Sequence, residues 1–130
     1  MKKEAYKLEY IFPKVSMPRM WRRISTELGL RAWIMGEVNI NAKGQVAFVW
    51  EDGERMTAQL EIVIPESKVR YNWTSGATGY FELEISQSEL TGDKLLTITD
   101  FAEPHELDSS RELWDIQVQK LRSIMGIRDH

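Results

Sequence analysis

The sequence predicts an α+β fold in which an antiparallel sheet is covered by one long C-terminal helix. Apolar residues recur at every second position in about seven short segments, which is typical of strands with one buried face. Turn residues separate most of these segments at short intervals, which favours hairpins between neighbouring strands. A single amphipathic stretch, 107–126, follows the last strand. Because an antiparallel sheet usually buries one face, we expect this stretch to cover it.

The overall composition excludes several classes of protein. The chain has 130 residues, which fits a single domain spanning 1–130. A net charge of −3 argues against nucleic acid as a partner, since phosphate-binding domains are usually basic. The absence of cysteine excludes disulfides, thiolate zinc sites and a cysteine nucleophile. The sequence shows neither a signal peptide nor an apolar run of membrane-spanning length, so we expect a cytoplasmic protein that is not membrane-embedded.

The N-terminal part predicts a strand and then a helix. Alternation over 5–12 places Tyr6, Leu8, Tyr10 and Phe12 on one face of the strand. Ser16 is a suitable N-cap, and Gly29 is expected to end the helix that follows. The apolar stripe of this helix consists of Met17, Met20, Trp21, Ile24 and Leu28.

The middle of the chain predicts six further strands. The inward residues of the first five are expected to be Val38 and Ile40; Val46, Phe48 and Trp50; Met56, Ala58, Leu60, Ile62 and Ile64; Val69, Tyr71 and Trp73; and Phe81, Leu83 and Ile85. The sequence Glu51-Asp52-Gly53 carries the signal of a tight hairpin. For the last strand, 94–101, two inward faces remain open, namely Leu96 with Ile98, or Leu95 with Thr97 and Phe101.

The final helix has a clear start, end and apolar face. Ser109 and Glu112 match a capping box, and Gly126 suits the position just past the helix end. Its stripe consists of Trp114, Val118, Leu121 and Met125, widened by Leu113, Gln117 and Ile124. Ile116 lies nearly opposite and is expected to be exposed. We interpret the stripe as packing on the sheet rather than on a partner, since a bare apolar sheet is not tolerated in a soluble monomer.

The sequence contains no recognisable catalytic or metal-binding motif. His105 lies among Asp100, Glu103, Glu106 and Asp108, but metal-ligand spacing such as H-E-x-x-H is missing. We interpret this segment as an acidic loop that favours the positive end of the following helix. The other histidine, His130, is the last residue and is not a candidate ligand. A G-x-S-x-G elbow and a phosphate-binding glycine loop are also absent, so no catalytic residue, metal or cofactor is expected.

The sequence also contains one basic cluster and three local motifs. The cluster, Arg19, Arg22, Arg23 and Arg31, could contact an acidic partner or a ligand carboxylate, although such faces are usually only solvated. The motifs are SMPRMWRRISTELGLRAWI with Trp21 and Trp33, VRYNWTSG with Trp73, and LWDIQVQKLRSIMG with Trp114.

Together with the element order, these motifs resemble the START-like (SRPBCC) helix-grip superfamily. That superfamily includes the birch-pollen allergen type, polyketide cyclases and heat-shock-chaperone ATPase activators. The similarity covers nearly the whole chain and is greatest to small stand-alone bacterial proteins of the activator type. It implies a curved antiparallel sheet of about six to seven strands wrapped around the long C-terminal helix, with one or two short helices after the first strand.

The resemblance also implies a cavity between the sheet and the final helix. Carried over by position, its lining is Trp33, Trp50, Tyr71, Trp73, Phe81, Trp114, Gln117, Val118 and Leu121. The expected function is non-catalytic binding of a hydrophobic small molecule or lipid by a monomer, unless these side chains fill the space. Two alternatives stay open. One is a co-chaperone-like protein-interaction module that uses its outer surface. The other is a polyketide cyclase-like enzyme, which would need an ionisable pair inside the cavity.

Overall fold

The computed structural model describes residues 2–34 and 36–127. Within these residues, seven antiparallel strands form one sheet in the order β1-β7-β6-β5-β4-β3-β2. The elements are β1 (Glu4–Phe12), α1 (Met17–Ser25), α2 (Glu27–Arg31), β2 (Gly36–Ile40), β3 (Gln45–Trp50), β4 (Arg55–Ile64), β5 (Lys68–Ser75), β6 (Tyr80–Gln87), β7 (Lys94–Ala102), the short 3₁₀ helix η1 (Pro104–Glu106) and α3 (Leu107–Ile124). The α+β helix-grip class is therefore confirmed.

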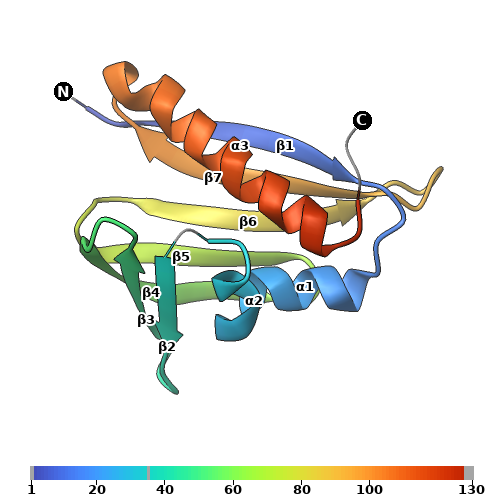
Figure 1. Cartoon of the computed structure of the whole chain (residues 1–130), viewed down its shortest axis with the longest axis horizontal. Helices are drawn as coiled ribbons and strands as arrows, with labels where there is room; N and C mark the ends of the chain where they lie inside the picture. Colours follow the sequence, from blue (N-terminus) through green and yellow to red (C-terminus); the bar gives the residue numbers. More distant parts are fainter. Residues whose placement is uncertain (1, 35, 128–130) are drawn as a thin grey trace.

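The three α-helices lie on one face of the sheet. In Figure 1, α3 runs across this face, and α1 and α2 lie near the C-terminal end of α3. The strand β1 pairs with β7, which places the first and last strands of the sequence side by side at one edge of the sheet. Among the described residues, no helix is long and apolar enough to cross a bilayer.

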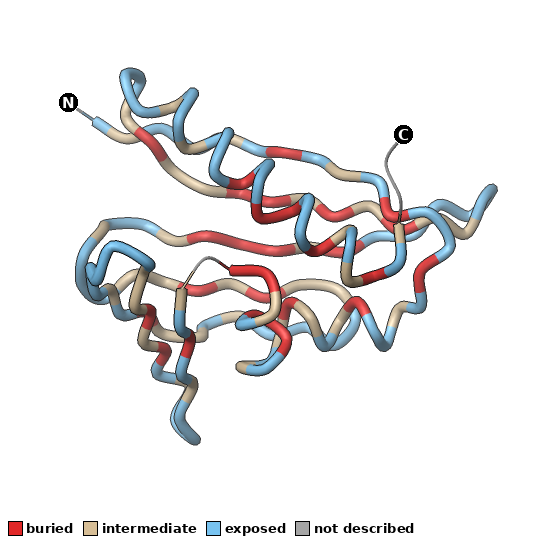
Figure 2. The backbone as a smooth tube through the Cα atoms, in the orientation of Figure 1, coloured by how far each residue is buried: buried red, intermediate tan, exposed pale blue. Residues whose placement is uncertain are grey.

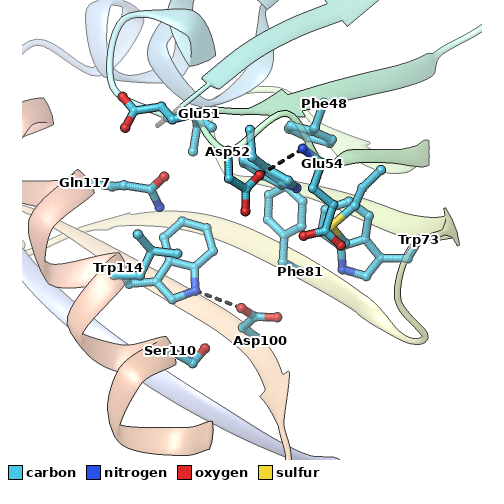
Figure 3. A pocket seen from close by; sticks show the side chains of 14 residues that line it. Phe48, Glu51, Asp52, Glu54, Trp73, Phe81, Asp100, Ser110, Trp114 and Gln117 are labelled. Atoms are coloured by element: carbon cyan, nitrogen blue, oxygen red, sulfur yellow. Dashed lines mark hydrogen bonds between the residues drawn. The ribbon is translucent and has the colours of Figure 1, made fainter.

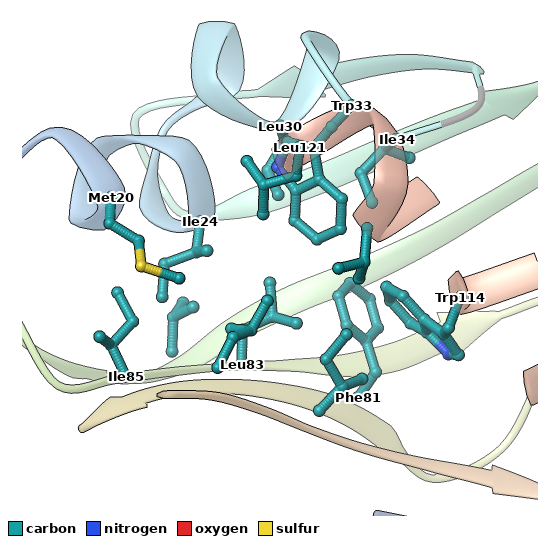
Figure 4. Packing of buried hydrophobic residues seen from close by; sticks show 14 of the residues in the cluster. Met20, Ile24, Leu30, Trp33, Ile34, Phe81, Leu83, Ile85, Trp114 and Leu121 are labelled. Atoms are coloured by element: carbon teal, nitrogen blue, oxygen red, sulfur yellow. The ribbon is translucent and has the colours of Figure 1, made fainter. Parts of the chain in front are cut away.

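The core lies between the helices and the inner sheet face. Trp114, Val118, Leu121 and Met125 are all buried, as the stripe of the final helix predicts. In the last strand, Leu96 and Ile98 are the inward pair, since both are fully buried. Figure 2 shows buried segments of the strands facing the buried side of α3. Figure 4 shows the side chains of α1 and α2 packed against the same strands.

The single helix expected to end at Gly29 is two helices. Thr26 has an extended backbone, with φ −122° and ψ 156°, and it separates α1 from α2. Its hydroxyl donates to the Arg22 carbonyl oxygen at 2.7 Å and accepts from the Gly29 N–H at 3.0 Å, so it caps both helices. The turn also removes Leu28 from the predicted stripe, and Leu28 is 75% exposed.

Gly29 is required for a close approach of the two helices rather than as a helix end. A Cβ atom at this position would lie 1.9 Å from the Arg22 carbonyl oxygen. That distance is far inside van der Waals contact, so no larger residue fits without moving α2 away from α1.

The predicted inward face of β4 is wrong beyond Leu60, because the strand contains a bulge there. The pairing shifts between Leu60, which lies opposite Tyr71, and Ile62, which lies opposite Arg70. A one-residue shift turns the following side chains to the other face of the sheet. Ile62 and Ile64 therefore lie on the outer face, and Ile64 is 49% exposed.

The final helix begins earlier than the capping-box motif predicts. Helix α3 starts at Leu107, directly after η1. The side chain of its N-cap residue, Glu106, makes no capping hydrogen bond. The Ser109 hydroxyl instead donates to the Glu106 carbonyl oxygen at 3.0 Å. The predicted end is confirmed, because Gly126 has φ +84° and its N–H donates to the Ser123 carbonyl oxygen.

Candidate ligand-binding site

A cavity of about 470 Å³ lies between the first half of α3 and the β3–β4 hairpin. Such a volume suits a small organic ligand, since ligand pockets usually measure ~300–1,000 Å³. Figure 3 shows the side chains of α3 facing those of the hairpin across this space. The lining residues are Ile34, Phe48, Trp50, Glu51, Asp52, Glu54, Met56, Trp73, Phe81, Asp100, Ser110, Leu113, Trp114 and Gln117.

Five aromatic residues form one continuous apolar wall of the cavity. Phe48 stacks on Trp50 with ring centroids 5.1 Å apart and lies 5.4 Å from Trp73. Phe81 lies 5.3 Å from Trp73 and 5.8 Å from Trp114, and so joins the sheet to α3. These separations are those of favourable aromatic pairs, which hold the rings in place without a ligand.

The structure divides the nine sequence-predicted lining residues into two groups. Trp50, Trp73, Phe81, Trp114 and Gln117 line the cavity, whereas Trp33, Tyr71, Val118 and Leu121 do not. The second group lies in the closed core beneath α1 and α2, and each member is at most 1% exposed.

Hydrogen bonds to α1 hold two residues of the second group. The Trp33 indole N–H donates to the Arg23 carbonyl oxygen at 2.8 Å, and the Tyr71 hydroxyl donates to the Ile24 carbonyl oxygen at 2.8 Å. The half of the interface near α1 and α2 is therefore filled by side chains, and the half near the hairpin is open. Whether any of the nine residues binds a ligand stays a prediction.

Asp100 is the most buried acidic group of the cavity. It follows Leu96 and Ile98 on the inward face of β7, where alternation turns its carboxylate toward α3. The Trp114 indole N–H donates to Asp100 Oδ2 at 2.8 Å, and the Phe101 backbone N–H donates to Oδ1 at 2.7 Å. Burial raises the pKa of Asp100 above its ordinary value, although these hydrogen bonds act in the opposite direction.

Two hydroxyl groups extend the polar network around Asp100. The Tyr6 hydroxyl donates to Asp100 Oδ2 at 3.4 Å and also contacts the hydroxyl of Ser110, which lines the cavity. Burial raises the pKa of Tyr6 to about 12. A perturbed carboxyl group in a cleft is a common mark of a functional site.

Three more carboxylates come from the hairpin at the mouth of the cavity. Glu51, Asp52 and Glu54 all line it and are all exposed. Asp52 Oδ1 accepts the Glu54 backbone N–H at 2.8 Å, which fixes the turn and the direction of the Asp52 side chain. Figure 3 shows Asp52 between Gln117 of α3 and Glu54 of the hairpin.

Sequence reasoning missed the acidic character of this site. Asp100 lies two residues after Ile98, on the same inward face of β7 as Leu96 and Ile98. Continuing the alternation to this position would have placed Asp100 on the face that packs against Trp114. The hairpin Glu51-Asp52-Gly53 was recognised as a turn, but nothing in a turn motif shows that it faces α3. Only the curvature of the sheet brings that hairpin to the helix.

The other predicted polar clusters lie away from the cavity. Glu103, His105 and Glu106 place their ligand atoms within 4.8 Å of one another, and His105 Nε2 lies 3.5 Å from the Glu103 carboxylate. His105 and Glu106 are exposed, as expected of an acidic loop at the start of a helix. His130 lies outside the described residues.

Most of the arginine cluster lines a second pocket, at the surface of α1 and α2. Arg19, Arg22 and Arg23 line this pocket together with the exposed Leu28. Arg31 points elsewhere, because its guanidinium group donates to the Val38 carbonyl oxygen at 2.7 Å and to Asn39 Oδ1 at 2.7 Å.

Comparison with known proteins gives the family. The model of the START-like superfamily domain matches residues 1–127. The solution structure of BfR322 from Bacteroides fragilis shares 40% identity at a TM-score of 0.67, covering 100% of this chain and 96% of that chain.

Two more distant structures share the fold. The Aha1 dimer from Colwellia psychrerythraea shares 14% identity at a TM-score of 0.73, with 98% of both chains covered. DynU16, a putative protein in the dynemicin biosynthetic locus, shares 13% identity at a TM-score of 0.75, covering 92% of this chain and 46% of that chain. No match was found among the curated proteins. The match of the family model over residues 1–127, together with the fold, shows that this chain belongs to the START-like superfamily.

Proposed function

We propose that the protein binds a hydrophobic small molecule, without catalysis, in the cavity between α3 and the β3–β4 hairpin. The observation that supports this most directly is the open, aromatic-walled space of about 470 Å³ beside an otherwise closed core. Burying an apolar ligand there would yield ~25 cal/mol per Å² before the costs of ordering are subtracted. Ser110 and Gln117, about two turns apart on α3, would orient the polar part of the ligand.

The first experiment is an amide and indole NMR titration with a fatty acid, a sterol, an aromatic polyketide and a neutral naphthalene alcohol. We expect at least one of these probes to cause saturable shifts at Trp73, Trp114 and Gln117. The indole N–H signals are the most direct reporters, because both tryptophans line the cavity while Trp33 lies in the closed core.

A pair of variants in α3 separates cavity binding from adsorption to the surface. Leu113 lines the cavity and is 46% exposed, whereas Ile116, also in α3, is 52% exposed and is not among the lining residues. We expect Leu113→Trp to narrow the cavity and weaken binding by roughly tenfold, and Ile116→Trp to leave it unchanged. The proposal fails if no probe binds, or if both variants bind as the parent protein does.

One surface feature favours a second candidate function, the co-chaperone-like interaction. Leu28 is 75% exposed beside Arg19, Arg22 and Arg23, which is a suitable surface for an acidic partner with an apolar contact. If this function holds, the protein will stimulate the ATPase of a heat-shock chaperone. The double variant Arg19→Glu/Arg23→Glu will then lose that stimulation, while Leu113→Trp will keep it.

The proposal includes a single domain, a cytoplasmic location and a monomeric state. The match of one family model to residues 1–127 supports the single domain. The Colwellia Aha1 structure is a dimer, so the oligomeric state requires its own measurement. Light scattering during size-exclusion chromatography should give a mass near 15.2 kDa for a monomer.

A further inference from the structure

The charge of the cavity is entirely of one sign. Four of its lining residues carry carboxyl groups, namely Glu51, Asp52, Glu54 and Asp100. None of the described lining residues is lysine, arginine or histidine. A ligand with a carboxylate or phosphate would therefore meet repulsion here, whereas a cation would be attracted.

The carboxylates are arranged for an organic cation rather than a metal ion. Among the described residues, the single group of three acidic or histidine side chains with ligand atoms within 4.8 Å is Glu103, His105 and Glu106. The carboxyl groups of the cavity do not converge in this way. They surround an apolar space, which a metal ion would leave empty and an organic molecule would fill.

The aromatic wall adds a second attraction for positive charge. Ring faces attract cations within ~6 Å of their centroids, and tryptophan does so most strongly. The rings of Trp50, Trp73 and Trp114 line the same space as the four carboxyl groups. An ammonium group in the cavity would therefore have both aromatic rings and carboxylates as neighbours.

Within the described part of the chain Asp100 forms no close ion pair; the charge of Lys3 lowers its pKa, but less than any of its hydrogen bonds does. Its three hydrogen-bond donors, the Trp114 indole, the Phe101 backbone and the Tyr6 hydroxyl, are all neutral. The ion pairs of the described residues are Lys68–Glu84, Arg70–Glu82 and His105–Glu103. A largely buried carboxylate without a close ion pair is costly, and a bound cation would offset that cost.

From these contacts we infer that the ligand of this cavity is a cationic amine carried on an aromatic or other apolar body. The inference rests on the proposed function, since it concerns the same cavity. The apolar body would lie against Phe48, Phe81 and Trp73, and the ammonium group would lie between Asp100 and the hairpin carboxylates. An alkyl or aromatic amine fits this description, whereas a free fatty acid does not.

The test uses three probes with one apolar body and different head groups. 1-Naphthylmethylamine carries a positive charge at about pH 7, 1-naphthalenemethanol is neutral, and 1-naphthoate is negative. Dissociation constants are measured by NMR titration and isothermal calorimetry at low and moderate salt. We expect the amine to bind roughly tenfold tighter than the alcohol and the naphthoate to bind weakest. Salt should reduce both differences, because it screens attraction and repulsion alike, and should leave the affinity of the alcohol nearly constant.

Charge-neutral variants assign the preference to the hairpin. Asp52→Asn keeps the oxygen that accepts the Glu54 N–H, so Asp52→Asn/Glu54→Gln removes two charges and preserves the turn. We expect this double variant to lower the affinity for the amine about fivefold more than it lowers the affinity for the alcohol. The control is Glu89→Gln, because Glu89 is exposed in the β6–β7 connection and is not among the lining residues.

The outcomes separate this inference from the proposed function. If the alcohol binds as tightly as the amine, the inference is wrong and hydrophobic binding stands. If the amine has the same dissociation constant for Leu113→Trp as for the parent protein, it binds at the protein surface outside the cavity, and the inference is also wrong. If none of the three probes causes saturable shifts at Trp73 and Trp114, the inference is wrong, and the proposed function then depends on the titrations with the fatty acid, the sterol and the polyketide.

Discussion

The hydrogen bond between Trp114 and Asp100 allows a prediction about the pH dependence of stability. Trp114 is 7% exposed, and its indole N–H lies 2.8 Å from Asp100 Oδ2. Replacing Trp114 by phenylalanine removes this donor but keeps an aromatic ring against Phe81. The buried carboxyl group then retains only the Phe101 N–H and the Tyr6 hydroxyl as donors.

The size of the effect depends on the charge of Asp100. A hydrogen bond to a charged group contributes about 1.5–3 kcal/mol, and one between neutral groups contributes about 1 kcal/mol. Burial raises the folded-state pKa of Asp100 above its unfolded value, so its stabilising contribution is fully present below about pH 4. That contribution is lost as the pH rises through the folded-state pKa.

Removal of the indole raises the pKa of Asp100 further, because the Trp114 hydrogen bond lowers it. The free energy of unfolding of Trp114→Phe should therefore fall more steeply with pH than that of the parent protein. We expect the destabilisation to be about 1 kcal/mol larger at about pH 8 than at about pH 4.5. The loss of ring volume adds a cost that is the same at both pH values.

Urea unfolding at the two pH values measures this difference, and Trp33→Phe is a matched control. Trp33 is fully buried and its indole N–H donates to the backbone carbonyl of Arg23, an acceptor that does not titrate. Its destabilisation should be the same at both pH values. Equal losses for Trp114→Phe at both pH values, or a matching pH effect for Trp33→Phe, would show that the charge of Asp100 does not cause the pH dependence.

Two further predictions concern the contacts that hold α1 and α2 on the core. Gly29→Ala should destabilise the protein by at least about 2 kcal/mol in urea unfolding, because its Cβ would lie 1.9 Å from the Arg22 carbonyl oxygen. Gly92→Ala meets open space and should cost only about 1 kcal/mol for its positive φ, so equal losses would contradict the steric argument. Tyr71→Phe should cost about 1–2 kcal/mol, since it removes the buried hydrogen bond to the Ile24 carbonyl oxygen. Burial raises the pKa of Tyr71, so its hydroxyl should stay neutral and this cost should be constant up to about pH 9. A cost that changes with pH in this range would show that the hydroxyl ionises.

The strands and the final helix were predictable because their signals are local. Alternation identifies a strand within a few residues, and a stripe such as Trp114, Val118, Leu121 identifies a buried helix face. The errors occurred where a local signal competes with another contact. Gly29 looked like a helix end but serves a close approach, and Ser109 looked like a cap although η1 precedes it.

The lining of the candidate site was predicted from the family resemblance, and only in part. Trp73 and Trp114 were expected to line a cavity, and they do line one. Asp100 and the hairpin carboxylates were not expected there, because their nearness depends on β7, α3 and the β3–β4 hairpin together. No spacing along the chain contains that information.

The α+β class, the element order and the buried face of the final helix follow from local patterns in the sequence, because period-two and helical spacing show which side chains avoid water. Which half of the space under α3 is closed depends on how distant elements pack together. Trp33 and Tyr71 are bound to α1 and fill one half, while the curved sheet carries Asp52 and Glu54 to the mouth of the other. An open cavity depends on the relative placement of elements far apart in the chain, and local periodicity does not encode that placement.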